Sequence, residues 1–190
     1  MALDLLKQFF RNPHQIGAVA TSTQSLGRMM LGETCIDSAD VIAEYGPGSG
    51  PFTRQILARK KSDATFFAIE QNPKMVECLR QKYPAVDCIE GSAADVGHHA
   101  RERGRDNVDL VVSGLPWAAF PEDLQDTLLT ATLDALRPGG EFVTFAYLCG
   151  LMTKAGKRFR KKLDEHFSVV EKSPTVWWNF PAAFVYRCKK

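Results

Sequence analysis

Three glycines at alternate positions, Gly46, Gly48 and Gly50, follow an apolar run that ends in an acid, Glu44. The run predicts a buried parallel strand, and the residues after the glycines have the pattern of a helix. Glycine can adopt a positive φ and has no Cβ that would keep a ligand away. The stretch therefore predicts a strand-to-helix turn whose backbone closely approaches a bound molecule, although such turns also occur for purely structural reasons.

The spacing of this turn selects among nucleotide-like ligands. The dinucleotide fingerprint is G-x-G-x-x-G, and its third glycine would fall on Pro51. Pro47 and Pro51 also lack the N–H groups with which a helix start binds pyrophosphate. The turn accordingly favours a cofactor that contains adenosine but no phosphate.

A second acid, Glu70, ends the next apolar run, Thr65–Glu70, about 20 residues after the glycines. At that distance an α/β nucleotide fold places the carboxylate that accepts hydrogen bonds from both ribose hydroxyls. The alternative is a capping acid for the helix that begins at Asn72 and Pro73. The glycine turn favours the ribose interpretation.

Glu44, the three glycines and Glu70 together resemble the cofactor site of class I S-adenosylmethionine-dependent methyltransferases. More narrowly, the chain resembles the small bacterial phospholipid N-methyltransferases, which are relatives of the ribosomal RNA adenine dimethylases. Residues 12–30, the glycine turn, residues 113–121 and residues 179–186 carry this narrower resemblance. It implies an α/β, Rossmann-like fold with a seven-stranded, mostly parallel sheet, an antiparallel last strand and helices on both faces.

The resemblance implies S-adenosyl-L-methionine as the cofactor. Methyltransferases of this class often carry an acid directly after the glycine that corresponds to Gly91, near the adenine amino group. This chain has Ser92 there, which leaves the adenine contact to Ser92 and Ala93. The expected cofactor-binding residues are Glu44, Gly46, Gly48, Gly50, Glu70, Gln71, Ser92, Ala93 and Ser113.

A second loop follows the apolar run 108–113 and is expected to face the glycine turn, because open α/β sheets bind ligands at strand carboxyl ends. Adenine dimethylases have Asn-Leu-Pro-aromatic there, and the Asn grips the target amine. This chain has Gly114, so a flipped base would lose its main partner, and no nucleic acid is expected. Trp117 is predicted to hold a methylated ammonium by cation–π attraction, or else to pack in the core.

The expected catalytic residues are Tyr147, Gly114 and Pro116, and the expected substrate-binding residues are Trp117 and Tyr147. Methyl transfer is an in-line attack on a sulfonium carbon, so alignment and water exclusion dominate. An ammonium must lose a proton before it can attack. Tyr147 is a candidate proton acceptor or orienter, His14 is a weaker one, and the sequence identifies no certain base.

The chain of 190 residues suits one domain, with residues 1–30 as an N-terminal helical cover. Its five cysteines are scattered without a C-x-x-C pair, so neither a disulfide frame nor a metal site is indicated and a reducing cytoplasm is expected. No run approaches the ~20 apolar residues of a membrane span. A monomer is expected.

Two segments suggest peripheral contact with the inner face of an anionic membrane. Residues 1–11 predict an amphipathic helix that lies in the membrane interface or packs on its own domain. Residues 154–162 contain six cations and no acid, which indicates a solvated helix face, a headgroup patch or a nucleic-acid patch. Two final strands are predicted over residues 168–179 and 182–188.

The predicted function is N-methylation of an amine, on a phospholipid headgroup such as phosphatidylethanolamine at the membrane surface. Three alternatives remain open: methylation of a soluble small-molecule amine, methylation of an RNA adenine, and a non-enzymatic cofactor-binding protein that keeps the fold.

Overall fold

The computed structural model describes residues 19–177, 179 and 181–190. The predicted helix over residues 1–11, His14 and most of the predicted cover segment lie outside the described residues. The α-helices are α2 (Val19–Leu31), α3 (Pro51–Arg59), α4 (Pro73–Lys82), α5 (Val96–Glu102), α6 (Glu122–Ala135) and α7 (Lys154–His166). The strands are β1 (Val41–Tyr45), β2 (Thr65–Glu70), β3 (Asp87–Glu90), β4 (Val108–Ser113), β5 (Leu136–Tyr147), β6 (Val169–Lys172) and β7 (Ala183–Lys189). Short 3₁₀ helices are η1 (Cys35–Asp37), η2 (Ala93–Asp95), η3 (Trp117–Ala119) and η4 (Leu148–Met152).

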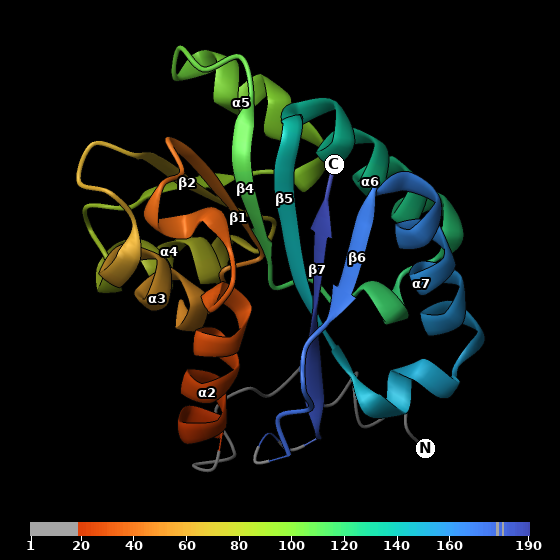
Figure 1. Ribbon diagram of the computed structural model, residues 1–190. Coiled ribbons are helices and arrows are strands. Elements are labelled where there is room, and N and C mark those ends of the chain that lie inside the picture. Colours follow the sequence, from red (N-terminus) through yellow and green to blue (C-terminus); the bar gives the residue numbers. More distant parts are fainter. Residues whose placement is uncertain (1–18, 178, 180) are drawn as a thin grey trace.

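The seven strands form one sheet in the order β3-β2-β1-β4-β5-β7-β6 (Figure 1). Strands β1 to β5 pair in parallel, and β7 is antiparallel to both β5 and β6. This confirms the predicted fold class. The register pairs Tyr45 with Ile69 and with Ser113, and Ser113 with Thr144. The loops after these strands therefore meet at one end of the sheet, the lower end in Figure 1.

Helices cover both faces of the sheet because alternate residues of each strand point to opposite sides. Val41, Ala43 and Tyr45 pack in a core that includes α5, α6 and α7, whereas Ile42 packs in a core that includes α2 and α3. Helix α4 packs on β2 and β3 through Val76 and Leu79. Both faces of β1 are buried, which explains its unbroken apolar run.

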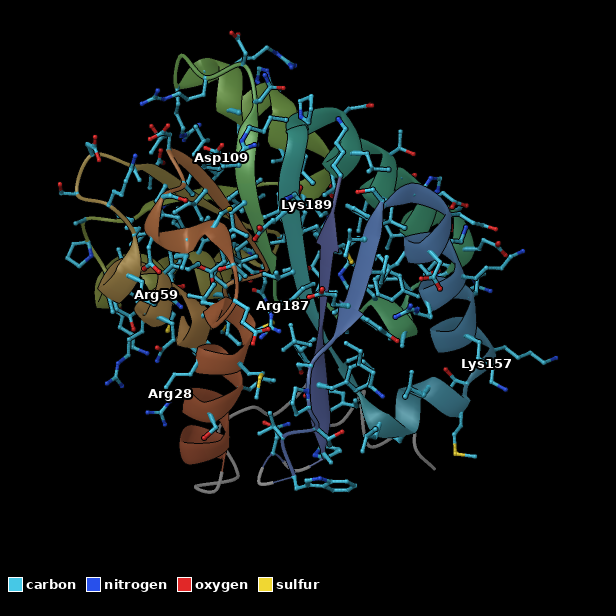
Figure 2. All side chains as sticks on the ribbon, in the orientation of Figure 1. Arg28, Arg59, Asp109, Lys157, Arg187 and Lys189 are labelled. Carbon is cyan, nitrogen blue, oxygen red and sulfur yellow. The ribbon has the colours of Figure 1, made fainter. Side chains whose placement is uncertain are left out.

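At the opposite end of the sheet, Asp109 connects the amino ends of three strands. Its carboxylate accepts the N–H groups of Asp40 and Val41 at 2.9 and 2.8 Å and pairs with Arg137. Figure 2 shows Asp109 far from the loops that follow the strands. An ion pair and hydrogen bonds therefore hold the amino ends of β1, β4 and β5 together, far from the loops that follow the strands.

One prediction of local structure was wrong, and one helix was not predicted. The predicted strand over residues 168–179 ends at Lys172, because Pro174 cannot donate to a strand ladder, and β7 begins at Ala183. The helix that was not predicted is α5, and Arg103 directly after it packs over the Phe67 ring and pairs with Asp87. Within the described residues, no helix is long and apolar enough to cross a membrane.

Candidate active site

The three glycines of the turn between β1 and α3 all have positive φ, at 62°, 53° and 82°. A Cβ at Gly46 would lie 2.7 Å from the Leu115 side chain, and one at Gly50 would lie 2.6 Å from the Tyr83 ring. A Cβ at Gly48 would meet nothing within 4 Å. Packing therefore explains the first and third glycines, while the middle glycine faces open space where a ligand can approach the backbone.

Glu44 lies beneath this turn and is fully buried. Its Oε2 accepts the Thr53 hydroxyl at 2.7 Å, and its Oε1 has no hydrogen-bond partner among the described residues. Burial raises the pKa of Glu44 to about 8, although the Thr53 hydrogen bond opposes the rise. A carboxyl group kept protonated next to a glycine turn is unusual, and such perturbed groups cluster at functional sites.

Glu70 stands at the end of β2 and turns its carboxylate toward the glycine turn. Its Oε2 accepts the Gly48 N–H at 3.1 Å, and its Oε1 accepts the Asn72 N–H at 2.9 Å. It therefore contacts both the turn and the start of α4, which Asn72 itself caps by accepting the Lys74 N–H at 3.1 Å. A ligand over Gly48 would meet this carboxylate.

The remaining predicted cofactor residues lie along the same edge of the sheet. The register pairs Glu70 with Glu90, which sets Gly91 and the following residues beside the end of β2. Gln71 is exposed, and Ala93 is buried. Ser92 caps η2 by accepting the Ala94 N–H at 3.2 Å. The structure brings these residues together with the turn, and their contacts with a cofactor stay a prediction.

The loop after β4 packs directly on the glycine turn. The Gly114 N–H donates to the Tyr45 carbonyl at 2.7 Å, and a Cβ at Gly114 would lie 2.7 Å from the Gly46 carbonyl oxygen. Contacts that short do not occur for real Cβ atoms, so residue 114 is glycine because two backbones approach closely there.

The structure gives the side chains of two predicted site residues a role inside the protein. The Ser113 hydroxyl is fully buried and accepts the Trp117 Nε1–H at 2.9 Å and the Leu115 N–H at 3.3 Å, so it fixes the loop, and contact of Ser113 with a cofactor stays a prediction. Trp117 is only 2% exposed and stacks on Phe159 with ring centroids 4.9 Å apart. Its ring faces are used in the core, as the packing alternative stated, and are not free to hold an ammonium.

Tyr147 ends β5 and lines an apolar pocket together with Pro116. Burial raises the pKa of its phenol well above the usual value near 10, so the group stays protonated at neutral pH. A protonated phenol can orient an amine by hydrogen bonding. It cannot act as the base, because that role needs the ionised phenolate. Of the two predicted roles for Tyr147, this favours the orienter.

The family model of a methyltransferase domain matches residues 42–140. The chain belongs to this methyltransferase family. The ornithine lipid N-methyltransferase of Singulisphaera acidiphila is 30% identical over 187 residues, covering 97% of this chain and 93% of that protein. Among solved structures, the O-methyltransferase TomG from Streptomyces achromogenes in complex with SAM has a TM-score of 0.69 at 16% identity, covering 95% of this chain and 94% of TomG. The O-methyltransferase from Bacillus cereus in complex with SAH has a TM-score of 0.68 at 14% identity, covering 90% of this chain and 81% of that one.

This methyltransferase uses S-adenosylmethionine, and its residues fit that cofactor. The open space over Gly48 admits a ligand against the backbone, and Glu70 at the end of β2 suits ribose hydroxyls. The orphaned Glu44 Oε1, which carries the proton when this carboxyl is protonated, provides a further buried hydrogen-bonding atom beneath the turn. When bound, the cofactor supplies a methyl group on a sulfonium sulfur.

Sequence reasoning missed two residues that hold the site. Thr53 in α3 donates to Glu44, and Gln125 in α6 is fully buried with its Nε2 donating to the Trp117 carbonyl at 2.7 Å. Both are polar residues on the buried faces of their helices. A polar residue at a core-facing helical position is the signal that would have identified them.

The cation-rich helix α7 of the methyltransferase is largely neutralised. Arg158 and Lys162 pair with Glu122, Lys162 also pairs with Asp126, and Arg160 and Lys161 pair with acids one turn later. Lys162 is 9% exposed, which contradicts its placement on an open patch. Lys154 and Lys157 are exposed and have no ion pair within the part of the chain that the structure describes, and Figure 2 shows Lys157 pointing away from the body.

Proposed function

We propose that this methyltransferase transfers methyl groups to the primary amine of a membrane lipid headgroup, such as phosphatidylethanolamine or an ornithine lipid. The observation that carries the proposal is the similarity to an ornithine lipid N-methyltransferase over nearly the whole of both chains. An RNA acceptor is disfavoured because residue 114 has neither an amide side chain nor room for one. A soluble amine remains an outcome of the test below.

The reaction requires the protein to bind the cofactor, to position the acceptor and to favour the deprotonated amine. The turn at Gly48 and the carboxylate of Glu70 would hold the cofactor, while the loop of Gly114 and Pro116 would position the acceptor against it. The apolar surroundings of Tyr147 would exclude water and lower the cost of deprotonating the acceptor ammonium, because burial disfavours a charged group. The neutral Tyr147 phenol would orient the resulting amine, and water would take the proton before the acceptor closes the site.

The surface at this end of the sheet suits a membrane interface. Met152 is 85% exposed and Trp177 is 73% exposed, which is unusual for such large apolar side chains. Met152 ends η4, which follows β5 at Tyr147, and Trp177 follows Val176, whose isolated bridge to Ala183 lies beside Tyr147 because Tyr147 pairs with Ala183. The exposed Lys154 next to Met152 adds a cation for anionic headgroups.

We therefore infer peripheral contact through this end and not through the whole of α7. Sedimentation with anionic vesicles tests the inference, using the pair Met152→Ser and Trp177→Ser against the pair Arg160→Gln and Lys161→Gln. The first pair should reduce binding at low and high salt, because apolar burial does not weaken with salt. The second pair should leave binding nearly unchanged, because those cations are already paired. A larger loss of vesicle binding in the Arg160→Gln and Lys161→Gln pair would instead place the membrane contact on α7.

Turnover with methyl-labelled cofactor tests the proposed reaction. The acceptors compared are vesicles with phosphatidylethanolamine, vesicles with ornithine lipid, free ethanolamine and ornithine, and unmodified small-subunit ribosomal RNA. Label should enter a lipid amine only. Label in the free amines alone would establish a soluble acceptor, and dimethyladenosine in the RNA would overturn the proposal. Calorimetric binding of the cofactor without label transfer to any acceptor would favour the non-enzymatic alternative.

A further inference from the structure

A narrow pocket opens between the two loops that follow β4 and β5. It is lined by residues of η3, η4, the end of β5, α7 and β7. Residues that line it include Pro116, Ala118, Ala146, Tyr147, Leu151 and Phe159. Every lining residue is aliphatic, aromatic, proline or glycine, so no charged group faces the space.

Small residues keep this pocket open. A Cβ at Gly150 would lie 3.6 Å from the Ala118 Cβ, so the two walls stand one methyl group apart at that point. A Cβ at Gly156 would lie 2.1 Å from the Gly150 carbonyl oxygen, so the start of α7 must carry glycine to approach η4. Thr153 holds this junction, because its hydroxyl caps α7 by accepting the Gly156 N–H at 3.0 Å and donates to the Gly150 carbonyl at 2.8 Å.

The chemistry of the lining selects the occupant. A phosphate or ammonium in this space would lose its hydration and gain no ionic partner, which is strongly unfavourable. A hydrocarbon chain would gain free energy from leaving water. The pocket shares Pro116 and Tyr147 with the predicted transfer centre. The hydrocarbon chain of an acceptor whose amine reaches that centre would therefore find this apolar surface nearby, with the polar atoms that link amine and chain staying outside the pocket.

We propose that this pocket binds the hydrocarbon portion of the acceptor, so that the methyltransferase recognises an amine on an amphiphile and not the headgroup alone. The inference rests on the proposed function and adds the chain as a recognition element. It predicts that affinity for the acceptor depends on chain length up to the depth of the pocket.

Calorimetry in the presence of SAH tests this, with lysophosphatidylethanolamines of short acyl chain kept below their micelle concentration and with O-phosphoethanolamine as the chainless probe. In the native protein each added methylene should tighten binding about fourfold until the pocket is full. Ala118→Leu and Ala146→Leu each fill the space and should remove most of this chain-length dependence. Ala58→Leu, at an exposed position of α3 remote from the pocket, is the matched control and should retain it.

SAH affinity reports folding in every variant and should not change. The proposal would be overturned if both filled variants bind SAH and keep the same chain-length dependence as the native protein. It would also be overturned if the chainless and acylated probes bind the native protein equally. Failure of the proposed function is distinguishable, because it would be seen as no label transfer to lipid while the chain-dependent binding persists.

Discussion

Replacing Glu44 with glutamine should remove a pH dependence from the stability of the protein. Burial raises the pKa of this carboxyl to about 8 from 4.5, so the folded state keeps a proton that the unfolded state releases between those values. Because the folded state then binds more protons, the free energy of unfolding falls as pH rises from about 4.5 and becomes constant above about 8. At 1.36 kcal/mol per pKa unit, the full interval corresponds to about 5 kcal/mol, an upper limit if water enters the site when Glu44 ionises.

Urea denaturation at several pH values from 5.5 to 9 measures this dependence. The native protein should lose several kcal/mol relative to Glu44→Gln across that range, because the amide does not titrate and can keep accepting the Thr53 hydroxyl. Other titrating groups are common to both proteins and cancel in the difference. Glu90→Gln, at an exposed carboxyl that ends β3, is the matched control and should run parallel to the native curve. Parallel curves for the native protein and Glu44→Gln would show that Glu44 is ionised at neutral pH and refute the reasoning.

Three further changes test the candidate active site. Glu70→Ala should weaken S-adenosylmethionine binding by about 1–3 kcal/mol in calorimetry, because ribose hydroxyls would lose their acceptor, and unchanged affinity in the folded variant would remove this assignment. Gly48→Ala and Gly104→Ala both place a Cβ at positive φ in open space, so each should cost about 1–2 kcal/mol of stability in denaturation, but only Gly48→Ala should also weaken cofactor binding. Gly114→Asn should destabilise the protein by about 1–3 kcal/mol, because its Cβ would collide with the Gly46 carbonyl, and mass spectrometry should find no dimethyladenosine made by it.

The sheet and the cofactor edge could be predicted from the sequence because both depend on local patterns. Strand β4 has the predicted bounds, since its apolar run is buried on both faces and ends at a glycine. The glycine turn and Glu70 were placed correctly together because strand register sets their distance.

The acceptor edge could not be predicted as well because it depends on contacts distant in the chain. Trp117 lies in the loop after a strand, where ligand-binding residues are common, but its environment is set by hydrogen bonding to Ser113 and stacking on Phe159 of α7. The cation run of α7 also looked open, since the acids that pair with Lys162 come from α6. The i,i+4 partners Asp164 and Glu165 were visible in the sequence and could have been recognised.

The strand order divides the site between two halves that can vary independently. β1, β2 and the loop after β3 form the cofactor half, while the loops after β4 and β5 form the acceptor half. The close approach of Gly114 and Leu115 to Gly46 joins them. A lineage could therefore acquire a new acceptor by changing η3 and η4 while its cofactor half stayed constant. Among relatives with different substrates, we expect variation to concentrate at residues 116–119 and 148–152.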